Sequence, residues 1–230
     1  MLLPKLRQEV LEANLELVRR GLVLYTFGNA SGISRDDKLI VIKPSGVPYE
    51  EMKPEHLVVT DLDGKIVEGN LRPSSDLPTH VVLYQAFPKI GGVTHTHSEY
   101  ATSWAQARKP ILCFGTTHAD YFYGAVPVTQ TMTKEAIATE YEKNTGTAIV
   151  KAFEGLDYTA IPAVLVANHA PFTWGPDVAA SAYNAVVLEA VARMAYFTVG
   201  INSQAQGVGQ DLHDKHYLRK HGKDAYYGQK

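Results

Sequence analysis

The chain has 230 residues, of which 45% are hydrophobic and 20% are charged, and its formal net charge is -2. This composition is typical of a soluble globular protein, and the length favours a single domain over 1–230. The near-neutral charge excludes a general electrostatic attraction to nucleic acid. Cys113 is the only cysteine, so no internal disulfide is possible and the cytoplasm is the expected compartment. No run of about 18 uncharged apolar residues predicts a membrane span.

The first half of the chain is predicted to combine helices with short strands. Apolar residues recur at helical spacing over 5–20, which predicts an amphipathic helix. Residues 39–46 and 57–69 are β-branched runs closed by turn residues, and an Asp-Gly pair gives the second run the pattern of a hairpin. A proline in the first turn of 76–87 favours a helix there, and 90–97 is then expected to be a strand.

The second half is predicted to hold more helix. Residues 133–146 have a helical pattern that is expected to end at a glycine, and a second helix is expected over 147–156. Residues 161–169 form a short apolar strand pattern, and the long apolar segment 176–200 is a predicted helix. Strand spacings of this kind favour an α/β (α+β) sandwich with a mainly antiparallel sheet.

The His-x-His pair at residues 95 and 97 is a candidate metal site. Side chains alternate along a strand, so His95 and His97 are expected on one side, with Cα atoms about 6.5 to 7 Å apart. A catalytic zinc needs three or more protein ligands, and His169 and Asp76 are candidates for the third and fourth. The pair can equally be structural, Asp76 an ordinary N-cap and His169 a core histidine, so local pattern alone leaves both interpretations open.

Three short stretches have the composition of phosphate-binding turns. They are "GNASG" (28–32), "KPSG" (43–46) and "RPSSD" (72–76), and each combines small residues with hydroxyl or amide side chains. Singly, each is an ordinary turn sequence. None matches a Walker loop or a dinucleotide fingerprint. Together with a metal they suggest a small phosphorylated substrate.

These motifs, taken with "HTHS", "GTTHADYFYGAVPVT", "HAPFTWG" and the ending "DKHYLRKHGKDAYYGQK", identify a resemblance that covers nearly the whole chain. They resemble the 4-epimerase branch of the class II sugar-phosphate aldolase/epimerase superfamily. The resemblance implies a three-layer sandwich with helices on both faces of the sheet. It also implies a cytoplasmic homotetramer that acts on a sugar phosphate in carbohydrate metabolism, such as arabinose breakdown, with active sites at subunit interfaces and without nucleic acid or membrane partners.

The resemblance also assigns roles to residues. The implied ligands of one divalent metal per subunit, most often Zn²⁺ and alternatively Mn²⁺, are Asp76, His95, His97 and His169. The implied phosphate pocket is lined by Gly28, Asn29, Lys43, Ser45, Gly46, Ser74 and Ser75. The implied proton carriers are Asp120 and Tyr227, the latter from a neighbouring subunit, with His216 assisting near the tail.

The implied reaction interconverts L-ribulose 5-phosphate and D-xylulose 5-phosphate through cleavage and re-formation of the C3–C4 bond. Two alternatives stay open. An aldolase of the same superfamily would stop at cleavage, although such enzymes usually carry glutamate where this chain has Asp76. A non-catalytic scaffold module of the same fold would have no need of the four metal ligands.

Overall fold

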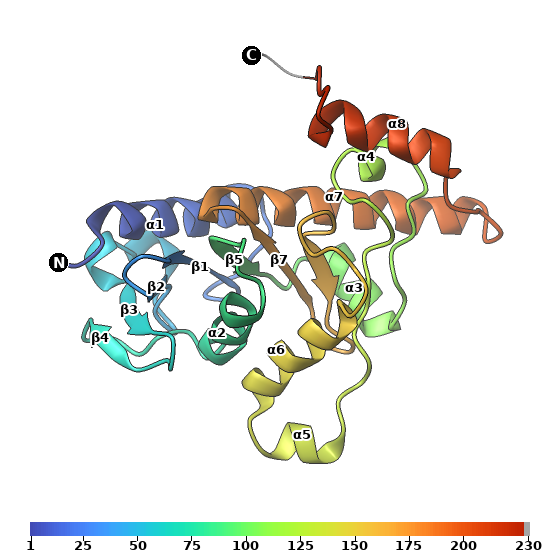
Figure 1. Ribbon diagram of the computed structural model, residues 1–230. Helices are drawn as coiled ribbons and strands as arrows, with labels where there is room; N and C mark the ends of the chain where they lie inside the picture. Colours follow the sequence, from blue (N-terminus) through green and yellow to red (C-terminus); the bar gives the residue numbers. More distant parts are fainter. Residues whose placement is uncertain (228–230) are drawn as a thin grey trace.

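A computed structural model describes residues 1–227, which form a sheet covered by helices on both faces (Figure 1). The strands are β1 (Asn29–Ser34), β2 (Leu39–Ile42), β3 (Val58–Asp61), β4 (Ile66–Glu68), β5 (Gly92–His95), β6 (Ala163–Leu165) and β7 (Pro171–Gly175). They lie in the order β4-β3-β2-β1-β5-β7-β6, and each neighbouring pair is antiparallel. The predicted antiparallel sheet is confirmed.

Helices form the two outer layers. They are α1 (Pro4–Arg19), α2 (Leu77–Ala86), α3 (Glu99–Ala107), α4 (Thr116–Ala119), α5 (Lys134–Ala138), α6 (Tyr141–Ala152), α7 (Val178–Ile201) and α8 (Gln210–His221), with 3-10 turns η1 (Tyr49–Glu51) and η2 (Pro54–His56). Val41 of β2 faces α1 and α7, whereas its neighbour Ile40 faces α2 and α6. This alternation buries both faces of the sheet, as expected for a three-layer sandwich.

The predicted hairpin is the connection between β3 and β4. Gly64 has a φ of +78°, a left-handed conformation that glycine adopts without steric cost. The Asp61 carboxylate accepts hydrogen bonds from the backbone amides of Asp63 and Lys65, both at 2.9 Å. The turn is therefore held by a side chain as well as by its glycine.

The strand β1 differs from the prediction, which made residues 28–32 a turn. Only Gly28 has the positive φ of a turn residue, at +73°, and β1 begins at the next residue. Small side chains are needed there because a Cβ on Gly32 would lie 2.5 Å from Val178 Cγ2 and 2.7 Å from Leu6 Cδ1. Close packing of α1 and α7 on β1 therefore explains a strand with little intrinsic β propensity.

The segment around Gly146 also differs from the prediction. The expected helix over 133–146 is two helices, α5 and α6, and α6 continues through Gly146. A Cβ at Gly146 would lie 2.7 Å from Val82 Cβ, so the glycine allows α6 to pack closely on α2. It is a contact residue and not a helix end.

The predicted strand over 161–169 is shorter and turns back on itself. β6 covers only three of these residues, and Asn168, with a φ of +62°, begins the turn into β7. Asparagine tolerates this left-handed conformation better than most residues. His169 therefore lies in the turn between two antiparallel strands.

By length and hydropathy alone, α7 would pass as a membrane span. Its first part packs against the sheet, and the Asp177 carboxylate caps it by accepting from the Ala180 amide at 2.7 Å. Its last part leaves large apolar side chains exposed, namely Met194, Tyr196, Phe197 and Ile201.

Candidate metal centre and carboxylate cluster

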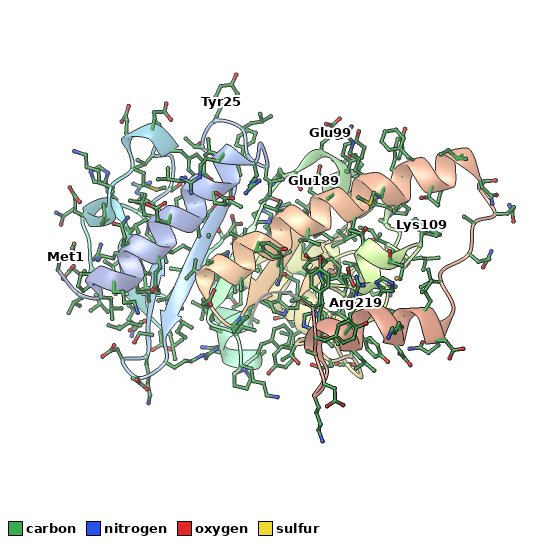
Figure 2. The ribbon with its side chains drawn as sticks, turned by 90° about the horizontal axis from the view of Figure 1, so that it is seen from above. Met1, Tyr25, Glu99, Lys109, Glu189 and Arg219 are labelled. Atoms are coloured by element: carbon green, nitrogen blue, oxygen red, sulfur yellow. The ribbon has the colours of Figure 1, made fainter. Side chains whose placement is uncertain are left out.

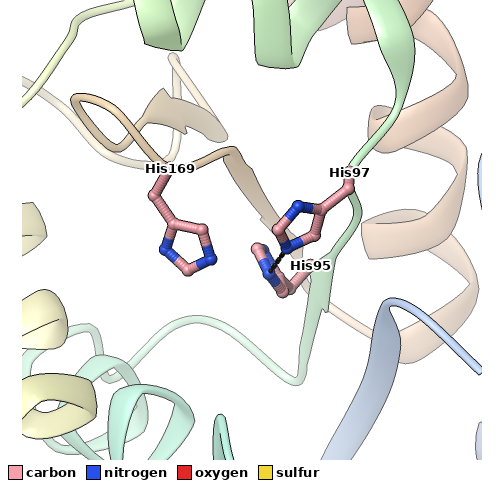
Figure 3. Close-up of side chains that lie close together, drawn as sticks. All are labelled: His95, His97 and His169. Carbon is pink, nitrogen blue, oxygen red and sulfur yellow. Dashed lines mark hydrogen bonds between the residues drawn. The ribbon is translucent and has the colours of Figure 1, made fainter.

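Three histidines converge beside the ends of β5 and β7 (Figure 3). His95 is the last residue of β5, His97 follows it by two residues, and His169 lies in the turn before β7. One ring nitrogen from each lies within 4.8 Å of the others, and the Nε2 atoms of His95 and His97 are 3.1 Å apart. Antiparallel pairing of β5 with β7 brings residues 72 or more positions apart to one point.

The donor atoms of this histidine trio suit a divalent metal. His95 Nδ1 lies 2.9 Å from the Pro171 carbonyl oxygen and donates to it, which leaves Nε2 as the free electron pair. Burial lowers the pKa of His169 to about 4 and also lowers the pKa of His97, so both rings are neutral at pH 7. Neutral imidazole is the form that binds metals.

Asp76, the expected fourth ligand, is not a member of the group of residues whose ligand atoms all lie within 4.8 Å of one another. Its Oδ2 accepts from Asn29 Nδ2 at 2.6 Å. Burial alone would raise the pKa of Asp76, but His95, His80 and the Asn29 amide outweigh that effect and lower it. Asp76 stands at the N-cap position of α2 without making a side-chain cap, and its carboxylate instead accepts from Asn29.

The three predicted turns lie together at the start of β1 and the end of β2. Asn29 Nδ2 donates to Ser74 Oγ at 3.0 Å, and the Ser74 amide donates to the Lys43 carbonyl at 2.9 Å. The residues Pro44 and Pro73 form an isolated antiparallel bridge. These contacts join the segments that carry Asn29, Lys43, Ser45 and Ser74, and Gly28, Gly46 and Ser75 are their neighbours in sequence.

Two backbone amides of these turns are engaged within the chain. The Ser45 amide donates to the Arg72 carbonyl at 2.9 Å, and the Ser74 amide is engaged by Lys43. Lys43 is 2% exposed, and burial lowers its pKa to about 8. Its ammonium lies 3.3 Å from the carbonyl oxygens of Thr26 and Pro44 and 4.8 Å from the centre of the Tyr49 ring. The lysine, more than the two amides, supplies positive charge here.

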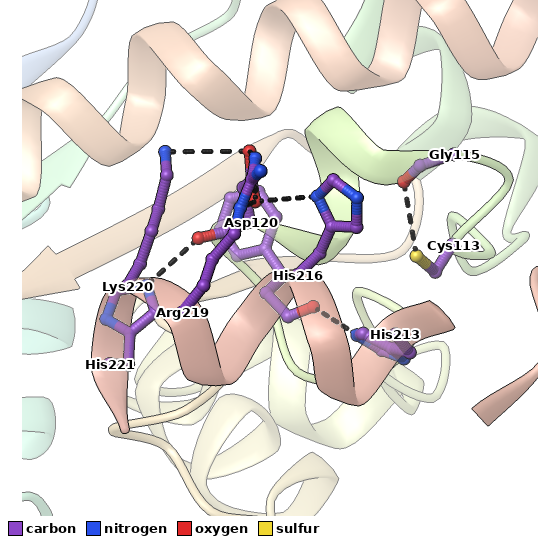
Figure 4. Close-up of polar contacts among 9 residues, drawn as sticks. Cys113, Gly115, Asp120, His213, His216, Arg219, Lys220 and His221 are labelled. Atoms are coloured by element: carbon purple, nitrogen blue, oxygen red, sulfur yellow. Dashed lines mark hydrogen bonds and ion pairs between the residues drawn. The ribbon is translucent and has the colours of Figure 1, made fainter. Parts of the chain in front are cut away.

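A second cluster forms around Asp120, the C-cap of α4, where α8 packs against it (Figure 4). Arg219 donates to both carboxylate oxygens, at 3.0 and 2.9 Å, and His216 Nδ1 lies 3.0 Å from Oδ1. Lys220 Nζ lies 3.6 Å from Oδ2. Burial alone would raise the pKa of Asp120, but the hydrogen bonds from Arg219 and His216 and the charge of Lys220 outweigh burial and lower the pKa. We call Asp120, His216, Arg219 and Lys220 the carboxylate cluster.

Tyr227 lies against the carboxylate cluster of its own chain. Its ring centre is 4.9 Å from the Arg219 guanidinium carbon and 4.4 Å from Lys220 Nζ. Its side chain is 59% exposed, so the hydroxyl group is accessible from outside the chain. The structure thus brings three predicted residues of the proton-transfer group together, namely Asp120, His216 and Tyr227.

Residues 8–196 match the family described as Class II Aldolase and Adducin N-terminal domain. The chain belongs to this family. Two relatives, each called L-ribulose-5-phosphate 4-epimerase UlaF, from Salmonella paratyphi B and Salmonella typhi, are 51% identical to it over 226 residues. Each comparison covers 98% of this chain and 99% of the relative.

Two solved structures share the fold of this class II aldolase domain. An L-fuculose 1-phosphate aldolase has a TM-score of 0.79 and 28% identity, with 94% of this chain and 95% of the other covered. YgbL from Klebsiella pneumoniae has a TM-score of 0.72 and 27% identity, with coverages of 92% and 97%. The predicted fold class is confirmed by these neighbours.

The histidine trio and the carboxylate cluster occupy different parts of the chain, and Arg219 of the cluster lies on α8 (Figure 2). The trio lies toward α6, where Tyr141 is 6.1 Å from His169 between ring centres. Figure 1 shows α4 and α8 on the other side of α7 from α2 and α6. Within residues 1–227, no hydrogen bond, ion pair or ring contact joins Asp120 to the trio.

Three residues of these sites escaped the sequence analysis. Arg219 and Lys220 follow His216 at spacings of three and four, so this spacing alone predicts that the three side chains share one face of a helix. Tyr141 begins α6 and faces the trio, and Asp76 contributes to raising the pKa of its hydroxyl after burial and Glu142. No local pattern marks that tyrosine.

Proposed function

We propose that this protein interconverts L-ribulose 5-phosphate and D-xylulose 5-phosphate. The observation that carries the proposal is the histidine trio beside the phosphate-type turns, in a chain 51% identical to the UlaF epimerases over nearly its full length. Histidine nitrogens and a carboxylate near them fit a divalent metal, most readily Zn²⁺ with Mn²⁺ as an alternative. Asp76, His95, His97 and His169 would hold it.

The chemistry explains why a metal and a phosphate grip belong together. The proton on C4 is not adjacent to the C2 carbonyl, so it cannot be removed as an ordinary acidic proton. Cleavage of the C3–C4 bond instead gives an enediolate of C1–C3 and glycolaldehyde phosphate. A bound divalent ion supplies Lewis-acid stabilisation of the negative oxygens that develop during this cleavage. Re-addition to the opposite face of the aldehyde inverts C4 without a redox cofactor.

The phosphate turns would keep the aldehyde fragment in place while it rotates. Lys43 supplies a buried positive charge, and the hydroxyl groups of Ser45, Ser74 and Ser75 supply neutral donors. Gly28 lets this turn pack closely against β5, because a Cβ there would meet the His95 carbonyl oxygen at 2.9 Å. Holding only the phosphate leaves the aldehyde carbon free to turn over.

Two proton carriers are required, because the C4 oxygen loses a proton during cleavage and regains one after rotation. We assign these roles to Asp120 and Tyr227, with His216 fixing the Asp120 carboxylate. Their separation from the trio in one chain supports a homotetramer in which a neighbouring subunit supplies the whole carboxylate cluster. The exposed apolar residues at the end of α7 support such an association.

The test is incubation of the purified protein and Zn²⁺ with L-ribulose 5-phosphate, followed by separation of the products. D-Xylulose 5-phosphate should accumulate and free glycolaldehyde phosphate should not. His97→Asn, which removes one metal ligand, is the control and should form neither product. Accumulation of glycolaldehyde phosphate alone would make the protein an aldolase, and the absence of both bound metal and turnover after addition of Zn²⁺ or Mn²⁺ would favour a scaffold.

A further inference from the structure

Three buried polar side chains behind the metal centre form a hydrogen-bonded chain. Tyr84 of α2 lies 2.8 Å from Ser31 Oγ of β1, and the same oxygen lies 2.7 Å from His80 Nδ1 of α2. All three residues are 0% exposed. We call Tyr84, Ser31 and His80 the buried relay. Polar groups so deep in a core are costly unless they are fully paired, so their presence calls for a reason.

One atom of the buried relay and one atom of nearby Asn29 have no protein partner. His80 Nε2 and Asn29 Oδ1 are both buried and make no hydrogen bond within the described chain. Asn29 and Ser31 are two residues apart on β1, so their side chains lie on one face of the sheet. Asp76 and His80 are four residues apart, and the His80 amide donates to the Asp76 carbonyl at 3.1 Å. The same helical turn therefore carries the metal-side carboxylate and the end of the relay.

The relay has a preferred direction. If Tyr84 donates to Ser31 and Ser31 donates to Nδ1, the ring proton of His80 is on Nε2. Nε2 then carries an N–H group that needs an acceptor, and the Asp76 carboxylate is close enough to act electrostatically on the His80 ring. In the opposite direction, His80 Nδ1 would donate to Ser31 and Ser31 would donate to Tyr84. Nε2 would then carry a lone pair near the Asp76 carboxylate, and the Tyr84 hydroxyl would need a further acceptor. The first direction satisfies more groups.

We propose that the buried relay is a positioning device in which His80, as its Nε2–H tautomer, donates to the Asp76–Asn29 pair through one bridging water. Asn29 already donates to Asp76 Oδ2 at 2.6 Å. A second donor would fix the carboxylate in the orientation that a metal requires. His80 is a positioning residue and touches neither substrate nor metal. This inference rests on the metal site of the proposed function.

The histidine ring also packs beside the metal centre through one shared neighbour. The centres of the His80 and Phe172 rings are 6.0 Å apart, and the Phe172 ring stacks on His95 at 4.1 Å. A substitution at His80 could therefore act by altering packing. The experiment must separate loss of a donor from loss of volume.

The experiment measures zinc affinity of the metal-free protein by competition with a chromogenic chelator. His80→Leu keeps most of the volume but removes both nitrogens, and zinc affinity should fall by about 10- to 100-fold. His80→Gln places an amide donor near the position of Nε2, and its affinity should be closer to that of the unaltered protein. A role in packing alone would give the opposite order, because leucine suits an apolar contact better than glutamine.

His118→Leu is the matched control. His118 is 3% exposed and also has an unpartnered Nδ1, but it lies on α4 by the carboxylate cluster. It should lose stability without losing zinc affinity. Equal zinc affinity of His80→Leu and the unaltered protein would overturn the inference. Absence of tight zinc binding in the unaltered protein would instead overturn the metal site itself.

A second measurement does not depend on a folded His80 variant. The ¹⁵N chemical shifts of the His80 ring in the metal-free protein should show a neutral ring protonated at Nε2. In Tyr84→Phe, which removes only the far hydroxyl, the two tautomers should become mixed, and zinc affinity should fall less than in His80→Leu. A ring protonated at Nδ1 in the unaltered protein would contradict the proposed direction.

Discussion

Single residues in this protein gain their character from burial more than from their immediate sequence neighbours. Lys43 is the clearest example, because its ammonium is buried against carbonyl oxygens and an aromatic ring and no carboxylate within residues 1–227 pairs with it. Burial therefore lowers its pKa to about 8. The charged form is present below that pH and is lost as the pH rises through it.

This behaviour predicts an alkaline limit to substrate binding. The value of kcat/KM for L-ribulose 5-phosphate should fall as the pH rises through about 8, because Lys43 then loses the charge that attracts the phosphate. The phosphate itself has its second pKa near about 6 and does not change charge in this range. In Lys43→Met the value should be low and this limb absent. An unchanged alkaline limb in that variant would remove Lys43 from phosphate binding.

The sequence indicated which histidines lie together, but it did not indicate the geometry by which they meet. His95 and His97 were recognisable by their spacing, but the strand ends at His95, so alternation along a strand is not what brings them together. The pairing of Asp120 with Arg219 joins positions 99 apart and depends on how α8 packs against α4. Local patterns carry no information about such a contact.

At the scale of elements, small residues decide how closely layers approach. Gly32 lets α1 and α7 contact β1, and Gly146 lets α6 contact α2. The sequence analysis assigned both glycines to turns or ends, because glycine usually weakens helices and strands. Elements with strong periodicity, such as α1 and α7, were predicted to within a few residues. Elements built from small residues were missed, because tertiary packing overrides their local propensity.

This packing predicts opposite effects of one substitution at two helical glycines. Gly146→Ala should lower the free energy of unfolding by about 1–3 kcal/mol, because the new methyl group would lie 2.7 Å from Val82 Cβ. Gly200→Ala in α7 meets no atom within 4 Å and should raise it by up to about 1 kcal/mol. Urea unfolding of both variants checks this, and equal effects would contradict the packing argument.

For the whole molecule, the central relation is the separation of the trio from the carboxylate cluster. Asp120 and Tyr227 contact the same two cations, Arg219 and Lys220, within one chain. The sequence analysis expected Tyr227 to come from a neighbouring subunit. Because these contacts lie within one chain, we infer that a single neighbouring subunit supplies both proposed proton carriers.

Mixed oligomers test this arrangement. Refolding Asp120→Asn together with His97→Asn should restore activity to roughly a quarter of the sites or fewer, because random pairing unites an intact trio with an intact cluster about that often. Mixing Asp120→Asn with Tyr227→Phe should restore none, since every chain would then lack one of the two proposed proton carriers. Restored activity in the second mixture would show that the two carriers come from different chains.

The register of the sheet has a consequence for how the site can change. Asn29 of β1 pairs directly with His95 of β5, so the phosphate side and the metal side of the site are neighbours across one antiparallel ladder. A slip of one residue would turn every side chain of β1 to the other layer. The pairing register therefore fixes the distance between Asn29 and His95. Substitutions in the turns at the end of this ladder can therefore change which substrate is bound, while the distance between the proposed metal and phosphate sites stays constant.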